Sequence, residues 1–226
     1  MPPLAIETFA RAVDHTLLDP AAATPQIDAL CDQAAAHGLH AVCVYPWWVA
    51  RAVARLDGRA AVCTVVGFPH GLDPTAAKLV ATRAAVSRGA AEIDVVMAYG
   101  ALASGETDAV AADLAAVVEA AHGQGALVKV IVESARLSGD QLRSACRIVA
   151  QAGADFAKTS TGLAGPATVE AVELMRETLP ATVRVKASGG IRTAQAAAAM
   201  LDAGAARLGT SATLAIIDEL RLNAVA

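Results

Sequence analysis

The sequence predicts an α/β protein: a single-domain (β/α)8 TIM barrel that spans residues 1–226. Short runs rich in Val, Ile and Cys alternate with longer Ala-rich stretches of helical period, which is the pattern of βα units around a parallel sheet. Eight such units fit the chain, whose length lies near the lower end of the roughly 200 to 400 residues typical of this barrel. Polar residues also recur within or just after the expected strands.

Each expected strand is a short apolar run, and the first of them is the weakest. The strands are expected at Ala12–Thr16, Ala41–Val44, Ala61–Val66, Glu92–Met97, Leu127–Val132, Asp155–Lys158, Val183–Ala187 and Arg207–Gly209.

The segments between the strands have helical signals. Apolar residues in Ala109–His122 fall on one helical face, and Ser138 with Gln141 forms a capping-box pattern at the start of Ser138–Ala150. Glycines that suit left-handed helix caps stand a few residues before the next strand, at Gly38, Gly89, Gly123 or Gly125, Gly153 and Gly204.

The alternative fold is an open doubly wound sheet. A barrel is favoured because it brings the carboxyl ends of all eight strands to one mouth, so polar residues at those ends would meet. In an open sheet they would be spread along an edge. These residues are Asp14, His15, Thr16, Cys43, Thr64, Asp94, Lys129, Glu133, Lys158, Lys186 and Ser211.

Composition argues against several classes of partner. The 18 basic and 22 acidic side chains give a net charge of -4, so we expect no nucleic-acid partner and no polybasic membrane anchor. The N-terminal segment has no basic leader, and the longest charge-free run, residues 33–50, contains Pro46 and two histidines. The four cysteines form no CxxC pair. We therefore expect a cytoplasmic protein with reduced thiols and no membrane partner.

Two of the four lysines end consecutive expected strands. Lys158 lies in DFAKTSTG and Lys186 in VRVKASGG, so a barrel would place both in one enclosed mouth. Burial and like-charge repulsion favour loss of a proton from one of them, and a neutral lysine is a nucleophile toward carbonyls. The alternative is that each lysine only pairs with a carboxylate such as Asp94 or Glu133.

Three further residues could assist a lysine nucleophile. Asp94 alternates with apolar neighbours, so it can point into the barrel and relay protons through water. Lys129 is expected to support the site as a charge partner of Asp94. Asp14 is a second candidate carboxylate, although a turn or capping role is about as plausible.

Glycine-bearing turns follow the last three expected strands: Thr159–Gly162, Ser188–Gly190 and Gly209–Ser211. Backbone amides beside a helix N-terminus bind anions, and barrels of this type commonly bind phosphate near the last two strands. We therefore expect a phosphate site at these turns.

The chain closely resembles the deoxyribose-phosphate aldolase family in VDHTLL, AVCVYP, CTVVGFPHG, EIDVVM, KVIVES, AKTSTG, VKASGGIRT and LGTS. The resemblance implies a class I aldolase that cleaves 2-deoxy-D-ribose 5-phosphate to acetaldehyde and D-glyceraldehyde 3-phosphate, without metal or cofactor. It implies that Lys158 forms the Schiff base, Lys186 favours its neutral amine and Asp94 relays protons. It further implies substrate binding by Asp14, Cys43 and Thr161, and phosphate binding by Gly162, Gly189, Gly190 and Ser211.

The chain departs from the family at three places. Ala212 stands where many relatives have a second serine, and Leu163 where some have a basic residue after KTSTG. Some relatives also have a C-terminal tyrosine that assists proton transfer, whereas this chain ends LRLNAVA. These departures put phosphate affinity and turnover in question.

Several features have weaker functional interpretations. The five dispersed histidines lack zinc-binding spacing. Cys43 is either a reactive thiol at the mouth or a small buried residue. Trp47 and Trp48 suit a subunit contact, a pocket wall or helix packing, and Lys78 is expected to be solvated.

Two other functions stay open on the residues alone, an aldolase that acts on a 2-keto acid and a non-catalytic sugar-phosphate-binding barrel. The expected ligands are a sugar phosphate and aldehydes, and assembly into a homo-oligomer is also open.

Overall fold

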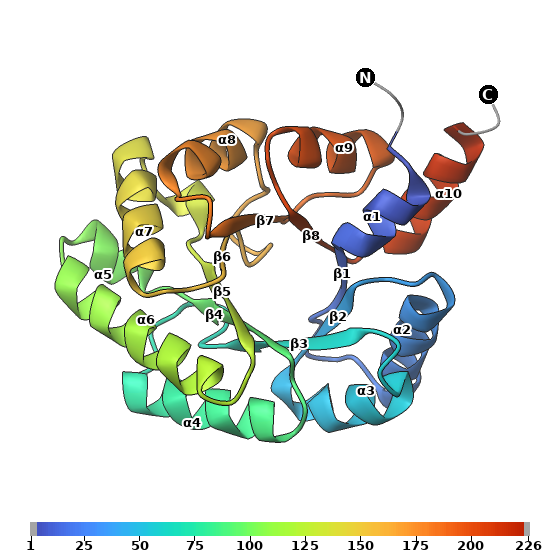
Figure 1. Ribbon diagram of the computed structural model, residues 1–226, viewed down its shortest axis with the longest axis horizontal. Helices are drawn as coiled ribbons and strands as arrows, with labels where there is room; N and C mark the ends of the chain where they lie inside the picture. The colour runs from blue at the N-terminus through green and yellow to red at the C-terminus, as the bar shows by residue number, and fades with distance from the viewer. Residues whose placement is uncertain (1–3, 224–226) are drawn as a thin grey trace.

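The computed structural model describes residues 4–223, in which eight parallel strands close into a barrel (Figure 1). Each strand pairs with the next along the chain, and β8 pairs with β1. The strands are β1 (Val13–Leu17), β2 (Ala41–Val44), β3 (Ala61–Val66), β4 (Glu92–Val96), β5 (Leu127–Ile131), β6 (Phe156–Lys158), β7 (Arg184–Ser188) and β8 (Arg207–Thr210).

Helices surround the strands on the outside of the barrel (Figure 1). They are α1 (Ile6–Ala12), α2 (Thr24–Ala36), α3 (Val49–Leu56), α4 (Thr75–Ser87), α5 (Tyr99–Ala103), α6 (Thr107–His122), α7 (Gly139–Gln151), α8 (Val169–Thr178), α9 (Ala194–Asp202) and α10 (Thr213–Asn223). Two short 3-10 helices, η1 (Pro46–Trp48) and η2 (Ser134–Arg136), follow β2 and β5.

The closed barrel confirms the expected fold and excludes the open sheet. Strand boundaries agree with the sequence expectation to within about one residue at each end. The capping box forms at the start of α7, where Ser138 Oγ accepts from the Gln141 amide at 3.3 Å. Of the two glycines considered after α6, Gly125 has the left-handed backbone, with φ 82°, whereas Gly123 has φ -60°.

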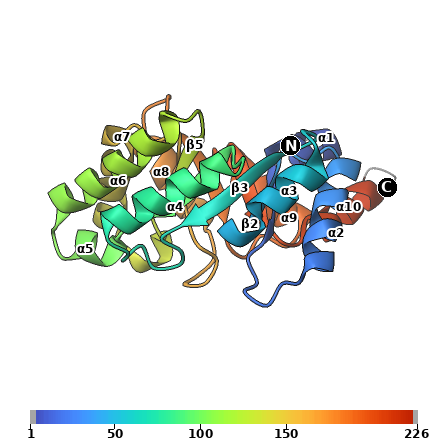
Figure 2. The ribbon, with the colours of Figure 1, turned by 90° about the horizontal axis from the view of Figure 1, so that it is seen from below.

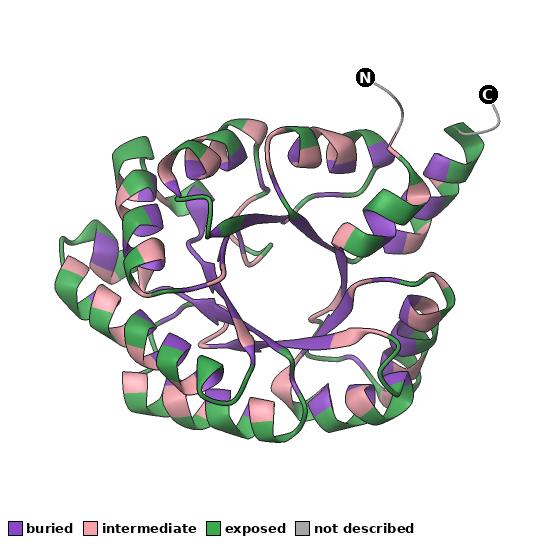
Figure 3. Cartoon of the chain, viewed as in Figure 1, coloured by how far each residue is buried: buried purple, intermediate pink, exposed green. Residues whose placement is uncertain are grey.

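Alternation along the strands separates two environments. In β4, Ile93 and Val95 belong to the apolar core between strands and helices, whereas Asp94 belongs to a network inside the barrel. The strands are buried almost throughout, and the helices expose their outer faces (Figure 3). Charged side chains are therefore enclosed within the barrel, separate from the main apolar core.

One expectation about a lysine was wrong. Lys78 on α4 is 1% exposed, and its Nζ donates to Asp113 Oδ2 on α6 at 2.6 Å. The Thr75 hydroxyl donates to the other oxygen of Asp113. Because α4 packs against α6, the long lysine stem is covered while its ammonium finds a carboxylate.

The two adjacent tryptophans, Trp47 and Trp48, have different surroundings. Trp47 is 80% exposed, so it neither lines a pocket nor packs on the barrel, whereas Trp48 packs against the apolar core.

Figure 2 shows the loops after β1 and β6 projecting from the same end of the barrel. Within residues 4–223, none of the helices combines the length and the apolar character needed to cross a bilayer.

Candidate active site

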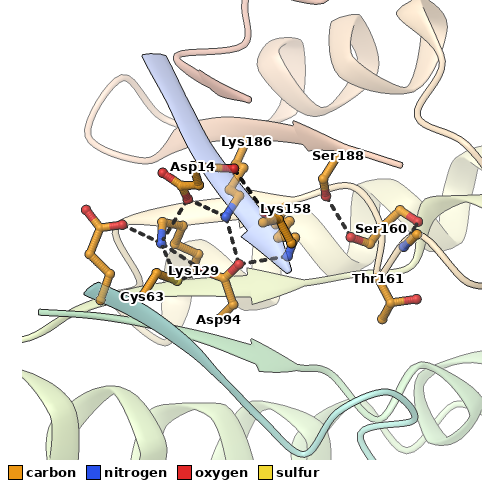
Figure 4. A network of polar contacts seen from close by, with 12 residues as sticks. Asp14, Cys63, Asp94, Lys129, Lys158, Ser160, Thr161, Lys186 and Ser188 are labelled. Atoms are coloured by element: carbon orange, nitrogen blue, oxygen red, sulfur yellow. Dashed lines mark hydrogen bonds and ion pairs between the residues drawn. The ribbon is translucent and has the colours of Figure 1, made fainter. Parts of the chain in front are cut away.

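A network of seven buried charged side chains lies inside the barrel, and we call it the barrel cluster. Figure 4 shows its members Asp14, Asp94, Lys129, Lys158 and Lys186. Asp94 lies at its centre. Asp94 Oδ2 accepts from Lys158 Nζ at 2.7 Å and from Lys186 Nζ at 2.8 Å, while Oδ1 accepts from Lys129 Nζ at 2.8 Å. The members are Asp14, Glu92, Asp94, Lys129, Lys158, Lys186 and Arg207.

The sequence analysis did not single out two members of this cluster. Glu92 Oε2 lies 2.6 Å from Lys129 Nζ and 3.2 Å from Arg207 Nη1. The same Arg207 nitrogen donates to Asp14 Oδ1 at 2.7 Å. The available signal was a charged residue at the first position of β4 and of β8.

The carboxylates of the cluster are held ionised. Burial alone would raise the pKa of Asp94, but the ammonium groups of Lys129, Lys158 and Lys186 outweigh it and hold the pKa well below its usual range. The pKa values of Asp14 and Glu92 are lowered in the same way, against burial, by the lysines and the arginine around them.

Two lysines of the cluster are held as cations. Burial opposes the charged form of Lys186, but the carboxylates of Asp14 and Asp94 outweigh it and raise its pKa. Lys186 Nζ contacts both carboxylates. The pKa of Lys129 is likewise raised, despite burial, first by Asp94.

Charge count and position distinguish Lys158 from the other cations. The cluster holds four cationic side chains against three carboxylates, so loss of one proton brings it to neutrality. Lys158 contacts one carboxylate, Asp94, whereas Lys129, Lys186 and Arg207 each contact at least two. Lys158 is therefore the cation whose deprotonation breaks the fewest ion pairs.

Lys158 also reaches a cavity of about 410 Å³ at the carboxyl ends of the strands. Asp94, Lys129 and Lys186 are fully buried and do not line the cavity. The cavity is lined by Thr16, Leu17, Leu18, Asp19, Lys158, Thr161, Gly162, Ser188, Gly189, Gly190, Ile191, Arg192, Gly209, Thr210 and Ser211.

The turn after β7 gives this cavity its unpaired amides. The amides of Gly190, Ile191 and Arg192 have no acceptor among residues 4–223. Gly190 has φ 75°, and a Cβ there would lie 2.8 Å from Pro166 Cβ, so both the backbone and the space require glycine. The turn precedes α9, whose first amide, that of Ala194, already donates to Glu219 Oε2 at 2.6 Å, so the amides of the turn itself remain for an anion.

The loop after β6 is fixed by a buried glutamate. Glu133 Oε2 accepts from the Thr161 hydroxyl at 2.6 Å, and Glu133 Oε1 accepts from the Ser160 hydroxyl at 2.9 Å. The Gly162 amide donates to Ser160 Oγ at 2.8 Å. Glu133 therefore does not pair with either strand-end lysine, and the Gly162 amide already has an acceptor within the loop.

The other sequence-predicted residues divide between the cavity and the barrel interior. Thr161, Gly162, Gly189, Gly190 and Ser211 line the cavity. Asp14 and Cys43 are fully buried outside its lining, and Cys43 packs with Cys63 and Val65. Asp14 therefore contacts other members of the barrel cluster instead of the cavity.

Two of the departures from the family pattern can be placed. Leu163 is 71% exposed, and the Ala212 amide donates to Thr210 Oγ1 at 2.9 Å. The extreme C-terminal residues, 224–226, lie outside the described residues. Arg192, which the sequence analysis quoted without assigning it a role, is an exposed cation on the cavity wall.

A metal ion would compete with a lysine for the donor atoms inside the barrel. One ligand atom each from Cys43, Cys63 and Asp94 lie within 4.8 Å of one another. Lys129 Nζ, however, lies 3.2 Å from Cys63 Sγ and 2.8 Å from Asp94 Oδ1. A divalent cation there would face an ammonium group at close range, so these donors do not suit a metal.

Comparisons with known proteins agree with this geometry. The sequence profile of the DeoC/LacD family of aldolases matches residues 8–218. The deoxyribose-phosphate aldolase of Geobacillus sp. (strain WCH70) is 46% identical over 217 residues, covering 95% of this chain and 97% of the relative. That of Thermococcus gammatolerans is 45% identical over 217 residues, covering 94% and 96%.

A solved structure extends the similarity to three dimensions. The deoxyribose phosphate aldolase from Aeropyrum pernix, described as having a unique tetrameric structure, superposes with a TM-score of 0.90 at 30% identity. The match covers 96% of this chain and 92% of that one.

Proposed function

This chain belongs to the DeoC/LacD family of aldolases, and on that premise we propose that it reversibly cleaves 2-deoxy-D-ribose 5-phosphate to acetaldehyde and D-glyceraldehyde 3-phosphate through a Schiff base on Lys158. One observation carries the assignment of Lys158. Lys158 is the lysine that both lines the cavity and contacts Asp94. It belongs to a cluster that has four cationic side chains and three carboxylates.

The reaction begins with the neutral Lys158 amine. The nitrogen attacks C1 of the open-chain aldose, and loss of water gives an iminium ion. The C3 hydroxyl then loses its proton, and the electron pair of the C2–C3 bond moves toward the iminium nitrogen. D-glyceraldehyde 3-phosphate leaves, and the two-carbon enamine of acetaldehyde stays on Lys158.

Asp94 is proposed to move the protons of this sequence. Its Oδ2 lies 2.7 Å from Lys158 Nζ, so the carboxylate adjoins the nitrogen that carries every intermediate. Its lowered pKa keeps the carboxylate ionised, so it can hold and orient a water molecule that carries protons to the substrate carbons. Protonation of the enamine and hydrolysis then release acetaldehyde.

Lys186 and Lys129 are proposed to support Lys158 electrostatically. Both are held as cations by the carboxylates around them. Their positive charges favour the neutral form of the Lys158 amine, because a third ammonium would add repulsion within the same enclosed cluster.

We place the phosphate of the sugar at the turn after β7. Gly190, Ile191 and Arg192, whose amides have no acceptor among residues 4–223, line the same cavity as Lys158, and so do Gly189 and Ser211. The guanidinium of Arg192 adds a positive charge at the wall. Gly162 shapes this cavity, but its amide is already bonded to Ser160.

We also propose that the protein forms a homo-oligomer. The support is the tetrameric description of the relative from Aeropyrum pernix, together with Trp47, a large apolar side chain that is 80% exposed. Light scattering of the purified protein after size-exclusion chromatography tests this. A monomeric mass across the accessible concentration range contradicts it.

Trapping of the Schiff base tests the function. The protein is incubated with acetaldehyde and sodium borohydride, and digested peptides are analysed by mass spectrometry. We expect a reduced two-carbon adduct on Lys158 and none in Lys158→Arg, while Lys78→Arg serves as a matched control that keeps the adduct. An adduct on another lysine refutes the site assignment.

The substrate is tested by steady-state cleavage of the phosphorylated sugar beside free deoxyribose. A higher kcat/KM for the phosphorylated sugar supports the proposed phosphate turn. Trapping of pyruvate in place of acetaldehyde would instead assign the chain to an aldolase for 2-keto acids. Absence of any adduct would leave a sugar-phosphate-binding barrel.

A further inference from the structure

We propose that Cys43 and Cys63 form a redox-sensitive thiol pair that a peroxide oxidises to a disulfide, and that this bond slows turnover by removing a hydrogen-bond donor from Asp94. Formation of the disulfide does not depend on the proposed aldolase function. Only its effect on turnover rests on that function.

The fold already holds the two cysteines opposite each other. β2 and β3 are parallel neighbours, and their register places Cys43 directly across from Cys63. Neighbouring strands lie about 4.8 Å apart, within the Cα separation of roughly 4.4 to 6.8 Å that disulfides span. The two sulfur atoms lie within 4.8 Å of each other. A disulfide therefore requires side-chain rotation and no change of strand register.

The pair lies close beneath the cavity wall. Cys43 and Cys63 are both fully buried, and with Val65 they form an apolar group separate from the main core. Leu18 is half-buried, packs on this group and also lines the cavity. A peroxide molecule is little larger than water, so displacement of one loop side chain opens a path from the cavity to the thiols.

The two thiols differ in the way that such a reaction needs. The neighbouring Cys63 side chain lowers the pKa of Cys43, whereas burial raises that of Cys63. Cys43 is thus the thiolate that attacks. Its sulfur takes one oxygen from hydrogen peroxide, giving a sulfenic acid and hydroxide. The sulfur of Cys63 then displaces the sulfenic hydroxyl, which leaves as water with the thiol proton, and a disulfide remains.

The new bond would change the surroundings of Asp94. In the reduced protein Cys63 Sγ lies 3.1 Å from Asp94 Oδ1 and 3.2 Å from Lys129 Nζ (Figure 4). A disulfide has no S–H, so Asp94 loses that donor, and the sulfur moves toward β2. We expect turnover to fall about tenfold, the effect of losing one hydrogen bond to a charged group.

The chain contains its own matched control. Cys31 on α2 and Cys146 on α7 are also buried, and burial raises their pKa values to about 11 and about 12. They lie on separate helices outside the barrel interior. Their double replacement by alanine removes two thiols without touching the pair.

The experiment treats the full-length protein with hydrogen peroxide and follows three quantities. These are the disulfide-linked peptides after digestion under non-reducing conditions, the cleavage rate, and recovery of that rate with dithiothreitol. The wild-type protein and Cys31→Ala/Cys146→Ala are expected to form the 43–63 link and to lose about tenfold in rate, reversibly. For Cys43→Ala and Cys63→Ala, we expect the cleavage rate after peroxide treatment to equal the rate of the same variant before treatment. Cys63→Ser is a second choice at that position.

The outcomes separate this inference from the proposed function. A 43–63 link in wild-type protein supports the thiol pair even if the protein has no aldolase activity. If Cys43 and Cys63 stay reduced while other residues of the protein are oxidised, the proposed redox-sensitive pair is wrong. A link that forms without changing the rate overturns the effect on Asp94, and a rate loss that persists in Cys63→Ala assigns the sensitivity to another group.

Discussion

Lys158 and Lys186 donate to the same oxygen atom, Asp94 Oδ2, at 2.7 and 2.8 Å. They come from neighbouring strands, and register pairs them directly. Lys186 has a second carboxylate partner in Asp14, whereas Lys158 opens to the cavity instead. Because of this difference in partners, Lys186 is held as a cation, whereas Lys158 is the candidate nucleophile.

Replacement of Lys186 by methionine should slow the reaction at neutral pH and move the rate–pH profile to higher pH. Without the Lys186 cation, the cluster needs the Lys158 ammonium to balance its three carboxylates, so the neutral amine becomes scarcer. We expect kcat to fall by roughly 10² to 10⁴. Lys186→Arg keeps the charge and should lose less. Equal losses in both variants at every pH would contradict the electrostatic role.

Glu133→Ala should loosen the loop after β6. The buried carboxylate accepts hydrogen bonds from Ser160 and Thr161, so its loss leaves both hydroxyls without that partner. We expect KM for the phosphorylated sugar to rise by about tenfold or more, since each lost charge-assisted hydrogen bond costs about 1.5–3 kcal/mol. The borohydride adduct should still form on Lys158. An unchanged KM would show that this loop does not shape the substrate site.

Ala212→Ser should strengthen phosphate binding. The added hydroxyl would stand beside Ser211, which lines the cavity, and would supply one donor to an anion there. A hydrogen bond to a charged group is worth about 1.5–3 kcal/mol, so we expect KM for the phosphorylated sugar to fall by up to about tenfold. Free deoxyribose serves as the control, because its KM should not change. Parallel changes for both sugars would count against a phosphate at this turn.

Lys78→Met should destabilise the protein strongly. It leaves Asp113 without its ammonium partner at a site where the Asp113 side chain is 11% exposed. Breaking a buried ion pair in this way costs about 3–5 kcal/mol. Chemical denaturation measures the loss, and the double variant Lys78→Met/Asp113→Leu should recover part of it. If the free energy of unfolding of the double variant is lower than the sum of the two single changes predicts, the pairing of Lys78 with Asp113 is refuted.

Acid should unfold the protein through the barrel cluster. The pKa values of Asp14, Glu92 and Asp94 are lowered in the folded state, so their contribution to stability is present above the unfolded values of about 4 and is lost as pH falls through the folded values. The free energy of unfolding should therefore decrease from about pH 5 downward. Glu92→Gln removes one of these groups and should flatten that slope. A slope identical to wild type would contradict the lowered pKa of Glu92.

The recurring strands and glycine caps were readable from the sequence because they obey local rules. The period of apolar residues predicts each strand, and the capping box at Ser138 depends on neighbours three residues away. Lys78 could not be read in this way. Its partner Asp113 lies 35 residues further along the chain, and only the packing of α4 on α6 covers both.

The sequence by itself determined that charged residues would stand within or at the end of neighbouring strands, because strand period and chain order are local properties. Only the tertiary structure decided which charges touch. Closing the barrel brings Arg207 of β8 onto Asp14 of β1 and carries Glu92 to the base of the same cluster. The number of carboxylates around each lysine follows from that closure, and this count is what leaves Lys158 with a single carboxylate and open to the cavity.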